Sequence, residues 1–218
     1  ELPTTCRRQR QMCIRDRRYF IHMSAGWKRD FPNVEQYYVF QIWPNACSMG
    51  NGNGDMLREV QRTLPNLYSD MSILSTLGIE PPGGCHYPLS GWAEFARLIQ
   101  PVMERDLYGK DFSHAITAPN LMSARFGSGG NDTILLEFDQ PVVWSEDLVD
   151  EFYLDDEPNL VASGTAVGER LTLELKKPVT AQAITYLKEK SWSQKKLLKG
   201  SNGIAALTFC DVRITPSE

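Results

Sequence analysis

The first half of the chain alternates between helical apolar periodicity and short, continuous apolar runs. Apolar side chains recur every three or four positions, as in amphipathic helices, over residues 19–31, 55–64 and 90–107. Between these segments, residues 37–43 form a compact apolar run rich in aromatic and β-branched residues, and residues 71–77 form a second apolar run; both runs predict buried strands. The order helix, strand, helix, strand, helix favours a parallel sheet covered by helices.

The spacing of apolar residues changes near Lys110, and the pattern of the second half predicts strands only. Strands are predicted at residues 133–138, 142–144, 152–154, 171–175, 183–186 and 204–214. Segments rich in Gly, Asn and Asp separate them, as turns do in small all-β domains. The predicted fold class is therefore α/β for residues 18–110, followed by a small β-sandwich domain over residues 111–218.

Composition and charge exclude several classes of protein. With 42% hydrophobic and 23% charged residues, each half can bury a core of its own. The formal net charge of −4 divides into +4 for residues 1–18 and −8 for the rest, and this acidic body would repel phosphate. We therefore expect no nucleic-acid partner. No apolar run is long enough to span a membrane, and the basic start lacks the apolar stretch of a signal peptide.

The N-terminal segment looks foreign to the rest of the chain. Residues 10–17, Arg-Gln-Met-Cys-Ile-Arg-Asp-Arg, resemble a translated sequencing-adapter segment found before unrelated predicted proteins. We therefore expect residues 1–17 to be non-native and the natural sequence to begin near Arg18, with its true N-terminus missing. On this interpretation, the lack of a targeting signal carries no information.

Cysteine spacing points to no metal site. Outside the suspect segment the cysteines are Cys47, Cys85 and Cys210, and no CxxC or Cys/His pattern of a zinc site is present. Free or buried thiols and a Cys47–Cys85 disulfide both stay open. The alternating glycines of residues 49–55 do not have the GxGxxG spacing of a dinucleotide loop, so no cofactor is expected.

His86 is the leading candidate for chemistry. It lies in a loop rich in Pro and Gly, residues 78–88, after the second predicted strand and therefore at the mouth of a parallel sheet. Imidazole can accept a hydroxyl proton and return it to a leaving group, as acyl transfer requires. The alternative is a hydrogen-bonded loop histidine. His22 and His114 are expected to be incidental.

A group of short motifs resembles one enzyme family. The block Gly-Gly-Cys-His-Tyr-Pro at 83–88 with Gly91, Ile-Gln-Pro at 99–101 and Arg-Asp-Leu-Tyr-Gly at 105–109 resemble the catalytic-histidine block of sialate O-acetylesterase-like proteins, which are SGNH (GDSL) hydrolases. Trp-Lys-Arg-Asp-Phe at 27–31 and Leu-Arg-Glu-Val-Gln at 57–61 are similar to two further family segments. The resemblance covers residues 19–109 and implies part of an SGNH-type, flavodoxin-like parallel sheet with flanking helices.

The resemblance also implies an activity and a site. The family hydrolyses acetyl esters on carbohydrates with a serine nucleophile, so His86 becomes the expected general base, and Gln41, Asn45 and Arg58 become expected substrate-binding residues of the cleft. The family's serine and oxyanion blocks are absent, so these 218 residues are expected to be an inactive fragment of a secreted or periplasmic protein. The expected partner is an acetylated carbohydrate, and the oligomeric state stays open.

A further departure from the family pattern keeps a second function open. SGNH enzymes often place an aspartate two or three residues before the histidine, but those positions here are Gly84 and Gly83, so the orienting carboxylate is unidentified and Glu80 is one candidate. A non-catalytic carbohydrate-binding or adhesion protein with an SGNH-like shape would tolerate those glycines. Aromatic residues of the second half are expected in the core, with sugar stacking as the alternative, at Trp144, Tyr153, Tyr186 and Trp192.

Overall fold

The first half of the chain is a short parallel sheet between helices. The computed structural model describes residues 4–44, 53–80, 86–188 and 193–217. Strands β1 (Tyr37–Phe40) and β2 (Met71–Leu74) pair in parallel, with Tyr37 opposite Met71 and Phe40 opposite Leu74. The helices of this half are α1 (Thr4–Asp30), α2 (Asn53–Thr63), the 3₁₀ turn η1 (Leu64–Asn66) and α3 (Gly91–Tyr108). The predicted order of helices and parallel strands is confirmed.

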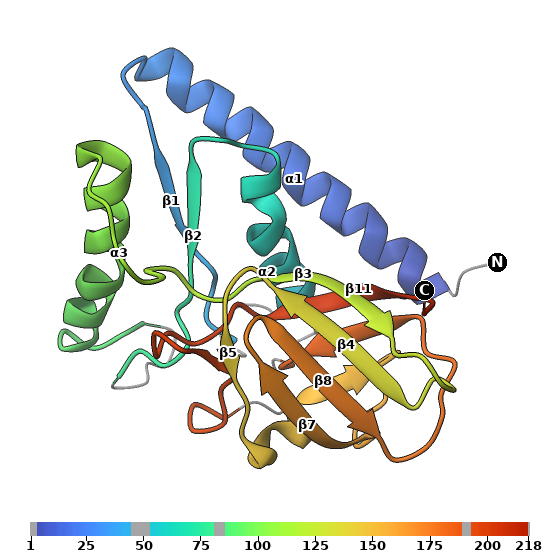
Figure 1. The fold of residues 1–218 in the computed structure, drawn as a ribbon. Coiled ribbons are helices and arrows are strands. Elements are labelled where there is room, and N and C mark those ends of the chain that lie inside the picture. Colours follow the sequence, from blue (N-terminus) through green and yellow to red (C-terminus); the bar gives the residue numbers. More distant parts are fainter. Residues whose placement is uncertain (1–3, 45–52, 81–85, 189–192, 218) are drawn as a thin grey trace.

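Helices cover both faces of this sheet (Figure 1). On one face, Tyr37 and Met71 pack against Val60 and Leu64 of the α2–η1 segment, with Phe20 of α1 beside them. On the other face, Leu74 packs against Leu98 and Val102 of α3. Side chains alternate between the two faces of a strand, so strands buried on both sides become continuously apolar. This explains the compact apolar runs of the sequence.

Helix α1 is continuous from Thr4 to Asp30, so its backbone runs through the segment predicted to be non-native. Its C-terminal end is fixed by an ion pair between Lys28 Nζ and Asp70 Oδ2 at 2.6 Å, just before β2 begins. Among the described residues, no helix combines the length and the apolarity needed to cross a membrane.

The second half is built on one seven-stranded mixed sheet, in the order β6-β9-β11-β3-β4-β8-β7. Its strands are β3 (Leu121–Phe126), β4 (Thr133–Phe138), β6 (Phe152–Leu154), β7 (Val161–Val167), β8 (Arg170–Leu175), β9 (Ala183–Tyr186) and β11 (Phe209–Thr215). Two further short strands, β5 (Val142–Val143) and β10 (Lys199–Gly200), pair with each other, and the 3₁₀ helix η2 (Glu146–Glu151) precedes β6. All pairings in the large sheet are antiparallel except β11 with β3.

The second half is all-β apart from η2, in agreement with the change of period near Lys110. The sequence did not predict β3, β7 or β10, and the run predicted as one strand over residues 204–214 is a strand only from Phe209. A register irregularity between Phe209 and Val212 lets β11 pair with β9 at one end and with β3 at the other. Because β11 pairs with β9 on one side and with β3 on the other, all seven strands form one hydrogen-bonded sheet. The two separate sheets of the predicted β-sandwich are therefore not distinguished.

A buried carboxyl group in this core predicts a pH-dependent stability. The side chain of Glu151 is 3% exposed, and burial raises its pKa from 4.5 to about 7 despite the nearby Lys196. Among the described residues, its Oε2 atom has no hydrogen-bond partner. Between these two pKa values the folded protein retains a proton that the unfolded chain releases, so stability is fully present below pH 4.5 and is lost as the pH rises towards 7.

We expect the free energy of unfolding to fall by roughly 3 kcal/mol between pH 4.5 and pH 7.5 through this group alone. Urea unfolding at several pH values measures the slope. The Glu151→Gln variant removes the titration but keeps the shape, so its profile should be flatter over this interval. An equal slope in the variant would contradict a role for Glu151.

Candidate active site

The carboxyl ends of the two parallel strands are tied together by hydrogen bonds. The backbone N–H of Gln41, the residue after β1, donates to the carbonyl of Leu74 at 2.8 Å. The hydroxyl of Thr76, two residues after β2, donates to the carbonyl of Gln41 at 2.8 Å. Ligands of open α/β sheets bind at this edge, outside the carboxyl ends of the strands. The candidate site is therefore sought here.

Tyr87 holds the histidine loop against this edge. Its hydroxyl donates to the carbonyl of Thr76 at 3.0 Å, and its ring lies edge-on to Trp43 and Phe95, with centroids 5.0 and 4.9 Å away. Burial raises the pKa of the Tyr87 hydroxyl, so the group stays protonated and remains a donor. A side chain at position 91 would meet the Tyr87 ring at 3.1 Å, which explains the glycine that opens α3.

His86 is thereby placed at the carboxyl edge with its side chain exposed. A solvent-accessible imidazole on an anchored loop can reach a hydroxyl of a bound substrate or of a serine. Among the described residues, no hydrogen bond or ion pair to the imidazole is present, including from Glu80, the candidate orienting carboxylate. Gly83 and Gly84 lie outside the described residues.

Gln41 is buried and holds the two halves of the protein together. Its side chain is 1% exposed, and its amide binds the backbone of Thr208 twice. Oε1 accepts the N–H of Thr208 at 2.9 Å, while Nε2 donates to the carbonyl of Thr208 at 2.9 Å and to that of Arg58 at 3.0 Å. The amide thus replaces a backbone strand partner for the residue that precedes β11.

Arg58 meets the same residue from α2. Its Nε atom donates to the hydroxyl of Thr208 at 3.0 Å, and its guanidinium forms an ion pair with Asp55 one turn earlier. At 1% exposure it is among the largest fully buried side chains. Arg58 is buried beside Asp55 because β11 and the segment before it cover α2.

The structure therefore brings together two of the four predicted site residues. Gln41 and Arg58 meet at Thr208, where both have protein partners. Neither contacts His86, and Asn45 lies outside the described residues. A substrate-binding role for Gln41, Asn45 and Arg58 stays a prediction, whereas a role for Gln41 and Arg58 in joining the two halves is a direct observation.

The sequence did not predict the aromatic cluster that includes Tyr87, the residue after His86. Phe95 of α3 contacts Tyr87, Phe40 and Trp92, with ring centroids 4.9, 4.9 and 5.1 Å away. Trp92 belongs to the apolar repeat of residues 90–107, but it is 55% exposed because it lies in the first turn of the helix, at the margin of a two-stranded sheet. The density of aromatic residues between 87 and 95 was the available signal.

The structure describes some of the aromatic residues and cysteines named in the sequence analysis. Tyr153 and Tyr186 are buried in the β core, as expected, and Trp144 is half-buried with its Nε1 donating to Glu146 at 3.0 Å. Trp192 and the Cys47–Cys85 pair lie outside the described residues. Cys210 is a buried free thiol. Within the part of the chain that the structure describes, no cluster of three or more His, Cys, Asp or Glu side chains could hold a metal ion.

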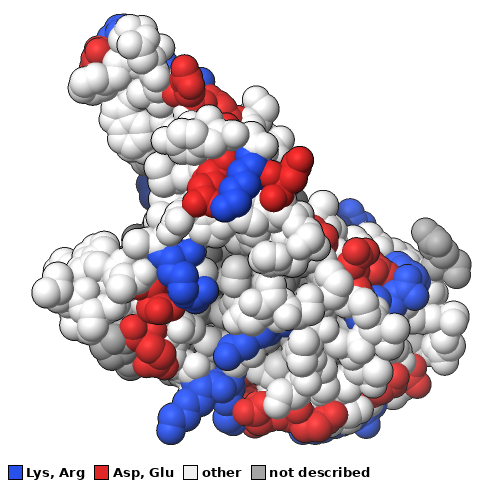
Figure 2. All heavy atoms as spheres, turned by 60° about the vertical axis from the view of Figure 1, so that its left-hand side comes forward, with Lys and Arg blue, Asp and Glu red and all other residues white. Residues whose placement is uncertain are grey.

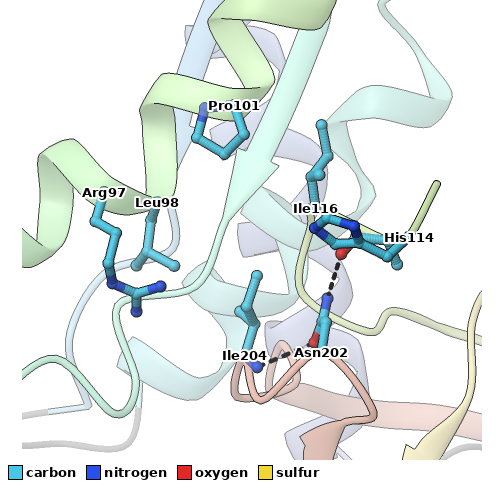
Figure 3. Close-up of a pocket in the computed structure, with 8 residues that line it drawn as sticks. Arg97, Leu98, Pro101, His114, Ile116, Asn202 and Ile204 are labelled. Carbon is cyan, nitrogen blue, oxygen red and sulfur yellow. Dashed lines mark hydrogen bonds between the residues drawn. The ribbon is translucent and has the colours of Figure 1, made fainter. Parts of the chain in front are cut away.

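A separate hollow of about 130 Å³ lies between α3 and the turn at residues 200–204. Figure 3 shows Arg97 and Leu98 on one side of it and His114 and Asn202 on the other. Asn202 Nδ2 donates to the carbonyls of Ala115 and Thr117 at 3.1 and 2.8 Å, so it fixes the connection between the halves. His86 does not line this hollow.

Charged side chains are mixed in sign on the face that includes α3. Figure 2 shows small groups of acidic and basic residues separated by wide uncharged areas. A polyanion such as nucleic acid is bound through a continuous basic surface, and this face does not present one.

Comparison with known proteins gives a likeness in fold. No protein-family model and no curated protein match the sequence. A solved structure, that of a carbohydrate acetylesterase from Xanthomonas citri, superimposes with a TM-score of 0.66 and 16% sequence identity. The two folds are alike. The likeness covers 90% of this chain, hence both halves, but only 46% of the other protein, so the chain spans less than half of that protein's length.

Proposed function

We propose that this chain is the histidine-bearing part of a carbohydrate O-acetyl ester hydrolase of the sialate O-acetylesterase-like, SGNH type. The observation that carries the proposal is the position of His86: exposed, at the carboxyl edge of parallel strands, on a loop anchored by Tyr87 to Thr76. The fold likeness to a carbohydrate acetylesterase supports it. Residues 18–110 would be the rear of the catalytic domain and residues 111–218 an accessory β-sandwich domain.

The proposed chemistry is acyl transfer in two steps. A serine oxygen attacks the acetyl carbonyl while His86 takes the serine proton; the bond between the carbonyl carbon and the sugar oxygen then breaks, and His86 gives the proton to that oxygen, which leaves as a hydroxyl. In the second step His86 takes a proton from water, the hydroxide attacks the acetyl-serine, and acetate leaves with the serine reprotonated. The serine and the oxyanion-binding groups would lie upstream of Arg18, in a secreted or periplasmic protein.

A second function, carbohydrate binding without catalysis, is favoured by one observation. Among the described residues, no carboxylate bonds to His86, so nothing there would stabilise an imidazolium. Reading the coding frame upstream of Arg18 separates the two functions. The esterase predicts a serine block followed by glycine and asparagine or glutamine blocks. A frame that contains no candidate serine would contradict it and leave the binding protein.

A further inference from the structure

Two large apolar side chains are exposed beside the histidine loop. Leu89 is 88% exposed and Trp92 is 55% exposed, and a turn with the Trp92 N–H donating to the Leu89 carbonyl at 3.2 Å keeps them on one surface. Adjacent exposed apolar groups of this size often mark a binding surface, whereas single ones do not.

The helix leaves the indole uncovered. Ala96 lies one turn after Trp92 on the same face of α3 and is exposed, and its methyl group is too small to shield the ring. Helical side chains lean towards the N-terminus of their helix, so the indole extends over the turn at residues 88–91. That turn begins two residues after His86, and the ring is therefore directed to the histidine side of the helix.

Aromatic contacts fix the position of this ring. Phe95 lies under Trp92 with ring centroids 5.1 Å apart and an interplanar angle of 34°. Phe95 in turn contacts Tyr87, the neighbour of His86 in the chain, at 4.9 Å. The exposed indole is thus a rigid extension of the cluster that anchors the histidine loop. A platform held in place in advance costs little conformational entropy when a ligand binds.

The surface fits a sugar ring better than a protein partner. Its apolar part consists of Leu89, Trp92 and Ala96, and the exposed amide of Gln100 follows Ala96 one turn later on the same side of α3. A stable protein interface needs about 800 Å² on each partner, far more than these side chains offer. A pyranose presents one apolar CH face surrounded by hydroxyls, which matches a flat aromatic ring with polar neighbours.

We propose that Trp92, supported by Leu89, is a stacking platform for a pyranose ring of the substrate next to His86, and so determines specificity for carbohydrate esters. This inference rests on the proposed function and names the part of the substrate that the α3 side of the site binds.

Affinity electrophoresis of the 218-residue chain in native gels with O-acetylated xylan or O-acetylated glucomannan tests the platform. The unmodified chain should be retarded by at least one polysaccharide, Trp92→Ala should weaken binding about tenfold, and Trp92→Phe should keep most of it. Trp27→Ala is the matched control. Trp27 lies on α1 and is also exposed, at 42%, but its ring stacks on that of Tyr37, with ring centroids 6.0 Å apart. The retardation of Trp27→Ala should equal that of the unmodified chain.

Two results would overturn the platform: no retardation of the unmodified chain by either polysaccharide, or equal retardation of the Trp92→Ala variant with its thermal unfolding unchanged. Hydrolysis of a sugar-free aryl acetate by the upstream-extended protein tests His86 separately. Sugar binding that depends on Trp92 without such hydrolysis would remove the esterase and keep the platform. Hydrolysis together with sugar binding that is unchanged in Trp92→Ala would keep the esterase and remove the platform.

Discussion

Hydrolysis of an aryl acetate by the protein extended upstream of Arg18 is expected to slow by about 10²- to 10⁴-fold when His86 becomes alanine. The histidine would move a proton in both steps, so its loss removes an interaction of the transition state. The fall should therefore appear in kcat, with little change in KM. Stopped-time assays of the released phenol measure both constants.

His114→Ala is the matched control for this prediction. His114 is also an exposed histidine of the described chain, but it lines the hollow between α3 and the turn at residues 200–204. Its replacement should leave kcat unchanged. Equal losses in the two variants would mean that His86 has no special role.

The Arg58→Met variant is expected to lose about 4 kcal/mol of unfolding free energy. Arg58 is 1% exposed, and methionine keeps much of its volume but leaves the carboxylate of Asp55 and the hydroxyl of Thr208 without the guanidinium. Removing one member of a buried ion pair costs far more than the pair contributes, because the remaining charge stays desolvated. Urea unfolding followed by circular dichroism measures the loss.

Arg97→Met provides a control with the same helical spacing. Arg97 pairs with Glu94 three residues earlier, as Arg58 pairs with Asp55, but the side chains of the Arg97–Glu94 pair are 64% and 36% exposed. Exposed pairs contribute little, so a change within about 1 kcal/mol is expected. Comparable losses for the two variants would refute the joining role assigned to Arg58.

The sequence predicted the helices and parallel strands because their signals are local. The face of α3 that is buried against β2 needs apolar residues at helical spacing. That spacing is visible in one amino-acid sequence by itself. Strand β7 was missed because Gly164 occupies a buried position of the strand, where alternation calls for a large apolar side chain. Gly164 is required by the ring of Trp144, since a Cβ atom there would lie 2.5 Å from it, and this contact between distant residues has no local signal.

The site could be predicted only in part for the same reason. The sequence placed His86 between the second strand and the following helix, where the structure has it, because Gly and Pro residues interrupt the apolar pattern after β2. It did not predict that Gln41 and Arg58 bind Thr208, which is 167 and 150 residues further along the chain. Contacts at such separations depend on how the β half docks, and periodicity does not encode that docking.

Acetate release from an O-acetylated oligosaccharide by the upstream-extended protein, followed by proton NMR, tests the proposed esterase activity most directly. We expect one acetate for each ester lost, with release abolished in the His86→Ala variant and retained in His114→Ala. Acetate release that is absent from the unmodified protein, or undiminished in His86→Ala, would contradict the proposal.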